Sequence, residues 1–137
     1  MFISNGDFRV IFSPYAEKHF CKDFGKKYRG KPWVETRRTI VATLERAAAF
    51  QSTDLIDVLR FSHENHAGIF KLDFRVAGTN VSPKGSGNRV IFSLSNVTSE
   101  VIILLVYAKT HCDKRHSETQ WALEQVKSAF SEWKQYC

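Results

Sequence analysis

Alternating apolar and polar positions predict a hairpin in the second half of the chain. Val90, Phe92 and Leu94 occupy every second position, which is the period of a strand with one face toward a core. Residues 101–106 are apolar on both faces and rich in β-branched side chains, which is typical of a central strand covered on both sides. Residues 95–99 have turn chemistry and connect the two strands.

The first half of the chain predicts one strand followed by two helices. Residues 8–12 form a short β-rich run, and Ser13 before a proline is typical of a helix start. Apolar residues at helical spacing predict a helix over 13–25. Pro32 opens a second helix, which we expect to end at residues 51–54.

The remaining segments comprise an ambiguous stretch, a charged strand, a long loop and a last helix. Residues 55–61 fit either a helical turn or an irregular segment. Residues 68–76 alternate as a half-exposed strand, whose open face carries Lys71, Asp73 and Arg75. Residues 78–88 are a mobile loop, longer than usual for a hairpin. A capping box formed by Ser117 and Gln120 begins the last helix.

This order of elements predicts an α+β fold. We expect a small antiparallel sheet, made of an N-terminal strand plus a three-stranded meander, with two N-terminal helices and a C-terminal helix. The helices are expected on one side of the sheet. A length of 137 residues, without a repeat or a boundary, predicts a single domain over 1–137.

Composition and charge narrow the class of protein. Apolar residues at 43% and charged residues at 25% indicate an ordered globular chain. A net charge of +6 favours phosphates, nucleic acid or an acidic protein as partner, although charge alone does not decide between them. Three cysteines, an odd and sparse set, favour a reducing compartment. No signal peptide and no segment near the ~20 apolar residues of a membrane helix is seen, so we expect a cytoplasmic protein without a membrane partner.

Two groups of side chains are candidates for a chemical site. A histidine-rich group matches no standard zinc spacing, so no metal and no cofactor is expected; it comprises His63, Glu64, His66, His111, Cys112 and His116. The second group is basic and phenolic: Lys71, Arg75, Lys84, Arg89, Tyr107 and Lys109. These residues fit either solubilising charges on an open sheet face or a concave surface that stabilises charge on RNA phosphates.

Short motifs in this second group resemble the RelE/ParE superfamily, especially its HigB-like branch. Residues 84–92 are similar to the pattern Lys-x-Gly-Gly-x-Arg-Val-Ile-Tyr, and residues 104–109 to Leu-Leu-x-Tyr-Ala-Lys. Residues 70–72 match the Arg-Lys-Leu-Arg strand in part. Members of this superfamily are toxins of type II toxin–antitoxin systems. The RelE and HigB types mostly cut mRNA in the ribosomal A site, and the ParE type poisons DNA gyrase.

The resemblance implies a catalytic set of Lys71, Lys84, Arg89 and Tyr107, with Arg75 and Lys109 as RNA-binding residues. Arg89 would clamp the scissile phosphate, Lys71 or Lys84 would act as base or charge stabiliser, and Tyr107 would orient the substrate. It also implies a cognate antitoxin, the ribosome and mRNA as partners. The alternative is a non-catalytic binding protein on the same scaffold, including a ParE-like topoisomerase inhibitor. Asp73, where the superfamily usually has a basic residue, favours that alternative.

Overall fold

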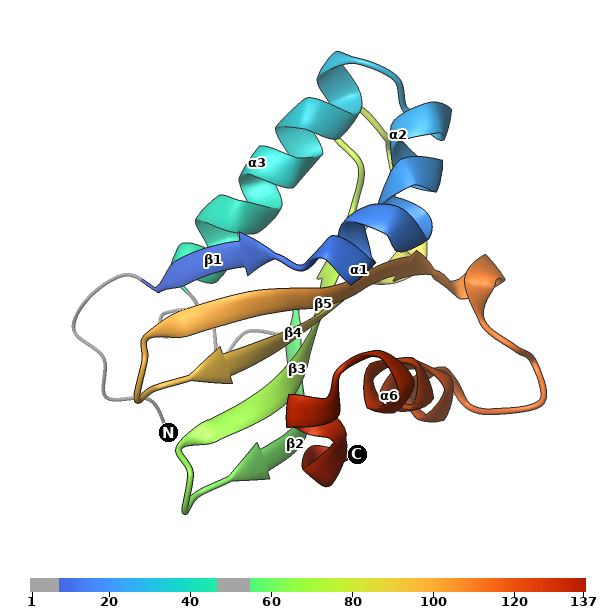
Figure 1. Cartoon of the computed structure of the whole chain (residues 1–137). Helices are drawn as coiled ribbons and strands as arrows, with labels where there is room; N and C mark the ends of the chain where they lie inside the picture. Colours follow the sequence, from blue (N-terminus) through green and yellow to red (C-terminus); the bar gives the residue numbers. More distant parts are fainter. Residues whose placement is uncertain (1–7, 47–54) are drawn as a thin grey trace.

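A five-stranded sheet lies at the centre of the computed structural model, which describes residues 8–46 and 55–137. Figure 1 shows the sheet between α3 and α6. The strands are β1 (Arg9–Phe12), β2 (Ile56–Ser62), β3 (Ala67–Phe74), β4 (Asn88–Ser95) and β5 (Glu100–Ala108). The helices are α1 (Pro14–Ala16), η1 (Glu17–Cys21), α2 (Lys22–Lys27), α3 (Lys31–Glu45), α5 (Pro83–Ser86), η2 (Lys109–His111), α6 (Glu118–Ala129) and η3 (Ser131–Tyr136).

The sheet is mixed, so the prediction of a small antiparallel sheet is wrong. Its strand order is β1-β5-β4-β3-β2, and β1 pairs in parallel with β5. The strand that was not predicted is β2, which is formed by the segment that the sequence left ambiguous. Its register shifts between Val58 and Arg60, and this irregularity breaks the alternation that would have marked it as a strand. The α+β class itself is retained.

Helices cover both faces of the sheet, which corrects the expectation that they lie on one side. On one face, Trp33, Ile40 and Leu44 of α3 share a core with residues of every strand. On the other face, α6 buries Trp121, Ala122, Leu123 and Val126 against Ile69, Ile91 and Leu105. The apolar stripe of α6 therefore covers the face that was expected to remain open.

The predicted first helix starts where expected but is interrupted. Ser13 caps it, because Ala16 N donates to Ser13 Oγ over 3.1 Å. Phe20 then has a φ of +72°, a left-handed value that breaks the helix. The break directs the Phe20 ring toward His111, with 4.3 Å between ring centroids. The predicted end of the second helix, at residues 51–54, lies outside the described residues.

A bulge in β5 decides where Tyr107 points. Ile91 pairs with Leu105 and Phe92 pairs with Ile103, so Leu104 has no residue opposite it. Leu104 and Leu105 consequently both contact the α6 core, and the alternation beyond them is reversed. The bulge thus places the Tyr107 side chain on the α6 face of the sheet.

Candidate functional site

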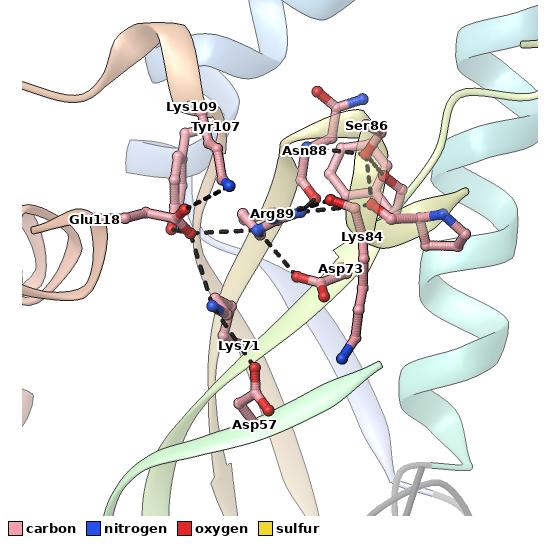
Figure 2. Close-up of polar contacts among 12 residues, drawn as sticks. Asp57, Lys71, Asp73, Lys84, Ser86, Asn88, Arg89, Tyr107, Lys109 and Glu118 are labelled. Atoms are coloured by element: carbon pink, nitrogen blue, oxygen red, sulfur yellow. Dashed lines mark hydrogen bonds and ion pairs between the residues drawn. The ribbon is translucent and has the colours of Figure 1, made fainter. Parts of the chain in front are cut away.

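Four donor groups converge on the carboxylate of Glu118, the first residue of α6 (Figure 2). Tyr107 Oη donates to Glu118 Oε2 over 2.8 Å, and Arg89 Nε donates to the same oxygen over 3.2 Å. Lys71 Nζ lies 3.7 Å from Glu118 Oε2, and Lys109 Nζ lies 3.9 Å from Glu118 Oε1. The donors belong to three neighbouring strands and the turn after β5, so sheet formation alone assembles them.

Strand register explains why these side chains meet. Asp73 of β3 lies opposite Arg89 of β4, which in turn lies opposite Tyr107 of β5. Directly opposed residues in antiparallel strands point to the same face, and here that face is covered by α6. The three side chains therefore form a row across the sheet, ending at Glu118.

Arg89 is fully engaged within the protein. The residue is only 5% exposed. Its guanidinium also donates to the carbonyl oxygens of Asn88 at 3.1 Å, Pro83 at 3.5 Å and Lys84 at 3.3 Å. The expectation that Arg89 faces an open side is therefore wrong, because α6 and the segment before β4 cover it. Arg89 fastens that segment to the sheet.

The segment before β4 is ordered by its own capping groups, although the sequence predicted a mobile loop. Ser82 caps the short helix α5 by accepting from Gly85 N over 3.0 Å. Ser86 Oγ donates to Phe74 O over 2.6 Å, which joins the helix to the end of β3. Gly87 has a φ of +78°, a conformation that favours glycine, and the chain turns there into β4.

Asp73 is a buried carboxylate whose main partner is Arg89. Arg89 Nε lies 3.0 Å from Asp73 Oδ1, and both side chains are almost inaccessible. The contact is a charge pair and not an aligned hydrogen bond, because Asp73 Oδ1 accepts no hydrogen bond within the described residues. Burial raises the pKa of Asp73 above its usual range, and the charges of Arg89 and Lys71 offset part of that rise.

Lys71 and Lys109 differ in how deeply their side chains are buried. The Lys71 side chain is 17% exposed and sits between two carboxylates, since its Nζ lies 3.6 Å from Asp57 Oδ2 as well as near Glu118. The Lys109 side chain is 59% exposed and stands at the rim of the cluster. Three carboxylates, those of Asp57, Asp73 and Glu118, thus hold this basic cluster in the present conformation.

Lys71, Arg89, Tyr107 and Lys109 together with Glu118 are called the Glu118 cluster. Two predicted site residues lie outside it. The amine of Lys84 extends away from Glu118 (Figure 2), and it forms no ion pair with any residue in 8–46 or 55–137. Arg75 follows β3, is exposed, and lines a cavity of about 280 Å³ beside Thr36 and Thr39 of α3. The structure therefore brings together Lys71, Arg89, Tyr107 and Lys109, and leaves Lys84 and Arg75 apart.

Glu118 is the residue that the sequence analysis missed. The segment was interpreted only as a helix start, and Ser117 does cap α6 by accepting from Gln120 N over 3.1 Å. A glutamate in the first helical turn is favourable for the helix dipole, so it gave no separate signal. Its contact with β3, β4 and β5 depends on how α6 docks, which local sequence does not specify.

Protonation states limit the chemistry of the cluster. Burial, followed by the charge of Glu118 and the hydrogen bond to it, raises the pKa of Tyr107 far above its usual range. The Tyr107 hydroxyl is therefore a proton donor near neutral pH. Burial and Glu118 also raise the pKa of Cys112 to about 11, so its thiol stays protonated. In the described part of the chain, no three His, Cys, Asp or Glu side chains gather as metal ligands.

No family model, curated protein or solved structure matches the chain at the significance required. Across residues 8–46 and 55–137, no helix has both the length and the apolar composition needed to cross a membrane. The interpretation of the cluster therefore depends on its own geometry and on the motifs in the sequence.

Proposed function

We propose that the protein is a toxin-like RNA endonuclease of the RelE/HigB type, which cuts mRNA on the ribosome. The observation that carries the proposal is the convergence of Tyr107, Arg89, Lys71 and Lys109 on one carboxylate. A phosphate group has the same charge sign and the same kind of acceptor oxygens as Glu118. Donors arranged around a carboxylate are therefore also suited to a phosphodiester.

RNA cleavage of this type needs no redox step and no metal in principle. The 2′-oxygen attacks the adjacent phosphorus, the bond to the 5′-oxygen breaks, and a cyclic phosphate and a 5′-hydroxyl result. One group removes the 2′ proton, another protonates the leaving oxygen, and cations stabilise the charge that builds on the phosphate.

The side chains divide among these tasks according to their surroundings. Tyr107 is a proton donor and suits a phosphate oxygen or the leaving group. Arg89 and Lys109 suit charge stabilisation, and so does Lys71, which is ion-paired with Asp57 and Glu118. The resemblance gives the base role to Lys71 or Lys84, and Lys84 could take it only after a movement of the segment before β4, because its amine extends away from Glu118 (Figure 2).

The carboxylate of Glu118 must move away from the four donors before a phosphate can bind to them. Arg89 is 5% exposed, and its Nε donates to Glu118 Oε2 over 3.2 Å. Glu118 stands at the very start of α6, and its side chain is 20% exposed. A change of its rotamer, or a movement of the first turn of α6, would free the donors. In this proposal the present conformation is the closed form of the site.

A second candidate is a non-catalytic binding protein on the same scaffold, including a ParE-like topoisomerase inhibitor. The observation that favours it is the saturation of Arg89 by Asp73, Glu118 and backbone carbonyls. Removal of an arginine held in this way would destabilise the fold whether or not the residue contacts a substrate.

The proposal also includes a cytoplasmic location, the ribosome and mRNA as partners, and an antitoxin protein that neutralises the chain. A basic toxin of this type is expected to be bound by a small acidic protein encoded beside it. Tightly induced expression should arrest bacterial growth, and coexpression of that neighbour should restore it. Normal growth at high levels of folded protein would contradict toxicity.

A cleavage assay on ribosomes with a defined mRNA tests catalysis directly. Tyr107→Phe should lower the cleavage rate by about 10²–10³, as expected for the loss of one donor to a developing oxyanion. Tyr136→Phe is the matched control, because its hydroxyl bonds Asn65 Nδ2 over 3.0 Å outside the cluster. If the parent cleaves RNA and Tyr107→Phe cleaves it at the same rate, the assigned site is rejected. If the parent does not cleave at all, the binding-protein alternative replaces the proposal.

A further inference from the structure

The turn that follows β5 is closed by a histidine. His111 Nδ1 accepts a hydrogen bond from the backbone N–H of Ala108 over 2.9 Å, at the position where a helix start commonly has glutamate or glutamine. Glutamine accepts such a bond at any pH, whereas histidine accepts it only while its ring is neutral. A protonated imidazole carries a hydrogen on both nitrogens, so it cannot accept from Ala108. Protonation of His111 therefore removes the bond that closes η2.

The His111 ring lies against α2, and its surroundings contain groups of both charges. Its side chain is 24% exposed, and its Nε2 lies 3.8 Å from Asp23 Oδ2. Burial lowers the pKa of His111 below its usual range, the charge of Asp23 opposes this and the charge of Lys27 adds to it. The charged and titratable groups near the ring are Asp23, Lys27 and Tyr28 in and after α2, and Lys109 and Cys112 on its own turn.

The structure leaves room for the ring to move. A cavity of about 90 Å³ is lined by His111 together with Asp23 and Phe24 of α2. A protonated ring that leaves Ala108 can enter this space and approach the Asp23 carboxylate. The two protonation states thus favour two positions of one side chain, one bonded to the backbone of the turn and one paired with α2.

A strained residue depends on the first of these positions. Phe20 has a φ of +72°, which is uncommon for a bulky side chain. Its ring lies near both His111 and Trp121, at centroid distances of 4.3 and 6.0 Å. A strained backbone persists only where the surrounding contacts hold it. Movement of His111 removes one of the two aromatic contacts, and relaxation of Phe20 then favours the moved position.

The same turn and the same aromatic group reach the Glu118 cluster. The turn η2 begins at Lys109, whose Nζ lies 3.9 Å from Glu118 Oε1. Trp121 lies about one helical turn after Glu118 in α6 and packs on Tyr107, with 5.1 Å between ring centroids. A movement of His111 consequently acts on the cluster along two routes, one through the turn and one through the aromatic rings.

We propose that His111 is a pH switch that holds the Glu118 cluster in its closed form. While the ring is neutral, η2 keeps Lys109 beside Glu118. Proton uptake in mild acid breaks the bond to Ala108, draws the ring toward Asp23 and loosens both the turn and the start of α6. The switch acts on these contacts whatever the substrate is, and its role in admitting a phosphate rests on the proposed function.

An NMR titration of the full chain tests the switch without RNA. Between pH 7.5 and 5, we would follow the His111 imidazole, the Ala108 amide and the Tyr107 ring. All three should change with one midpoint, below the usual 6.5 of histidine because burial disfavours the charged ring. The protection of the Ala108 amide against hydrogen exchange should fall by up to about tenfold per pH unit in this range, the limit for one bound proton.

Two variants show whether His111 is responsible. His111→Gln keeps an acceptor for the Ala108 N–H and takes up no proton in this range, so the acid changes at Ala108 and Tyr107 should disappear. His19→Gln is the matched control, because His19 is an exposed histidine whose Nδ1 lies 3.0 Å from Tyr15 O, and it should leave the midpoint unchanged. A His111 titration that leaves Ala108 and Tyr107 unaffected, or acid changes that persist in His111→Gln, would overturn the switch.

The titration and the cleavage assay fail independently of each other. A parent that cleaves RNA but shows no coupled titration would reject the switch alone. A parent that shows the coupled titration but cuts no RNA would reject the endonuclease and leave the switch standing.

Discussion

Tyr107 donates its hydroxyl hydrogen to Glu118 Oε2 over 2.8 Å, which ties the end of β5 to the first turn of α6. The same carboxylate faces Arg89, Lys71 and Lys109. One contact therefore has two consequences. It stabilises the docking of α6 on the sheet, and it occupies the position in which a phosphate would meet the four donors.

A conservative substitution tests how much the hydrogen bond between Tyr107 and Glu118 contributes to stability. Tyr107→Phe keeps the buried ring, which packs on Trp121 with 5.1 Å between centroids, and removes only the hydroxyl. We expect the free energy of unfolding to fall by about 1.5–3 kcal/mol, the range for a hydrogen bond to a charged group. Urea denaturation measures the change. Tyr136→Phe should alter stability by less than about 0.5 kcal/mol, and equal losses in the two variants would contradict the assignment.

Arg89 provides a second test of stability. Arg89→Met should lower the free energy of unfolding by about 3–5 kcal/mol, because it leaves the buried carboxylate of Asp73 without its main partner. The double variant Arg89→Met with Asp73→Leu should recover a large part of this loss. A single variant as stable as the parent, or a double variant less stable than the single one, would show that the pair does not hold this region.

Salt dependence tests how far RNA extends over the surface. Lys26 and Lys27 end α2, Arg29 lies in the turn after it and Lys31 begins α3, and all four residues are exposed. If RNA contacts both this segment and the cluster, its affinity should fall steeply with salt. Lys26→Gln with Lys31→Gln should reduce the slope of log K against log salt by about 1.4, from roughly 0.7 per lost phosphate contact. A slope equal to that of the parent would exclude contacts at this segment.

His111 should make the protein less stable in mild acid. Its Nδ1 accepts from Ala108 N over 2.9 Å, and burial lowers its pKa below the usual 6.5. The unfolded chain therefore binds this proton at a higher pH than the folded chain, so stability falls as the pH drops below about 6.5. Denaturation midpoints between pH 7.5 and 5 should decline less steeply in His111→Gln than in the parent. Parallel pH profiles would contradict this.

The local patterns predicted much of the fold. Val90, Phe92 and Leu94 do face the α3 core, and Ser13 and Ser117 do cap helices. These features depend on neighbours close in sequence. The parallel pairing of β1 was missed because a run of four residues carries no information about which sheet edge it joins.

The site was predicted only in part, for a related physical reason. Regular alternation from Val101 would place Tyr107 on the α3 face, and only the bulge at Leu104 reverses it. The apolar run in β5 hides that bulge, because both faces are apolar. Glu118 belongs to the cluster only because α6 docks across the sheet, which is a long-range contact. The motif residues were therefore found, and the carboxylate that organises them was not.

The competition between Glu118 and phosphate is tested most directly by the RNA affinity of Glu118→Gln. This variant keeps the shape of the side chain and removes the charge that holds the four donors. Glu124→Gln is the matched control, with the same charge change on an exposed position of α6. Dissociation constants for a short single-stranded RNA should show Glu118→Gln binding about tenfold more tightly than Glu124→Gln, as expected from freeing donors that are bonded to a charged group. Equal affinities in the two folded variants would contradict the account, because Glu118 would then not occupy the phosphate position.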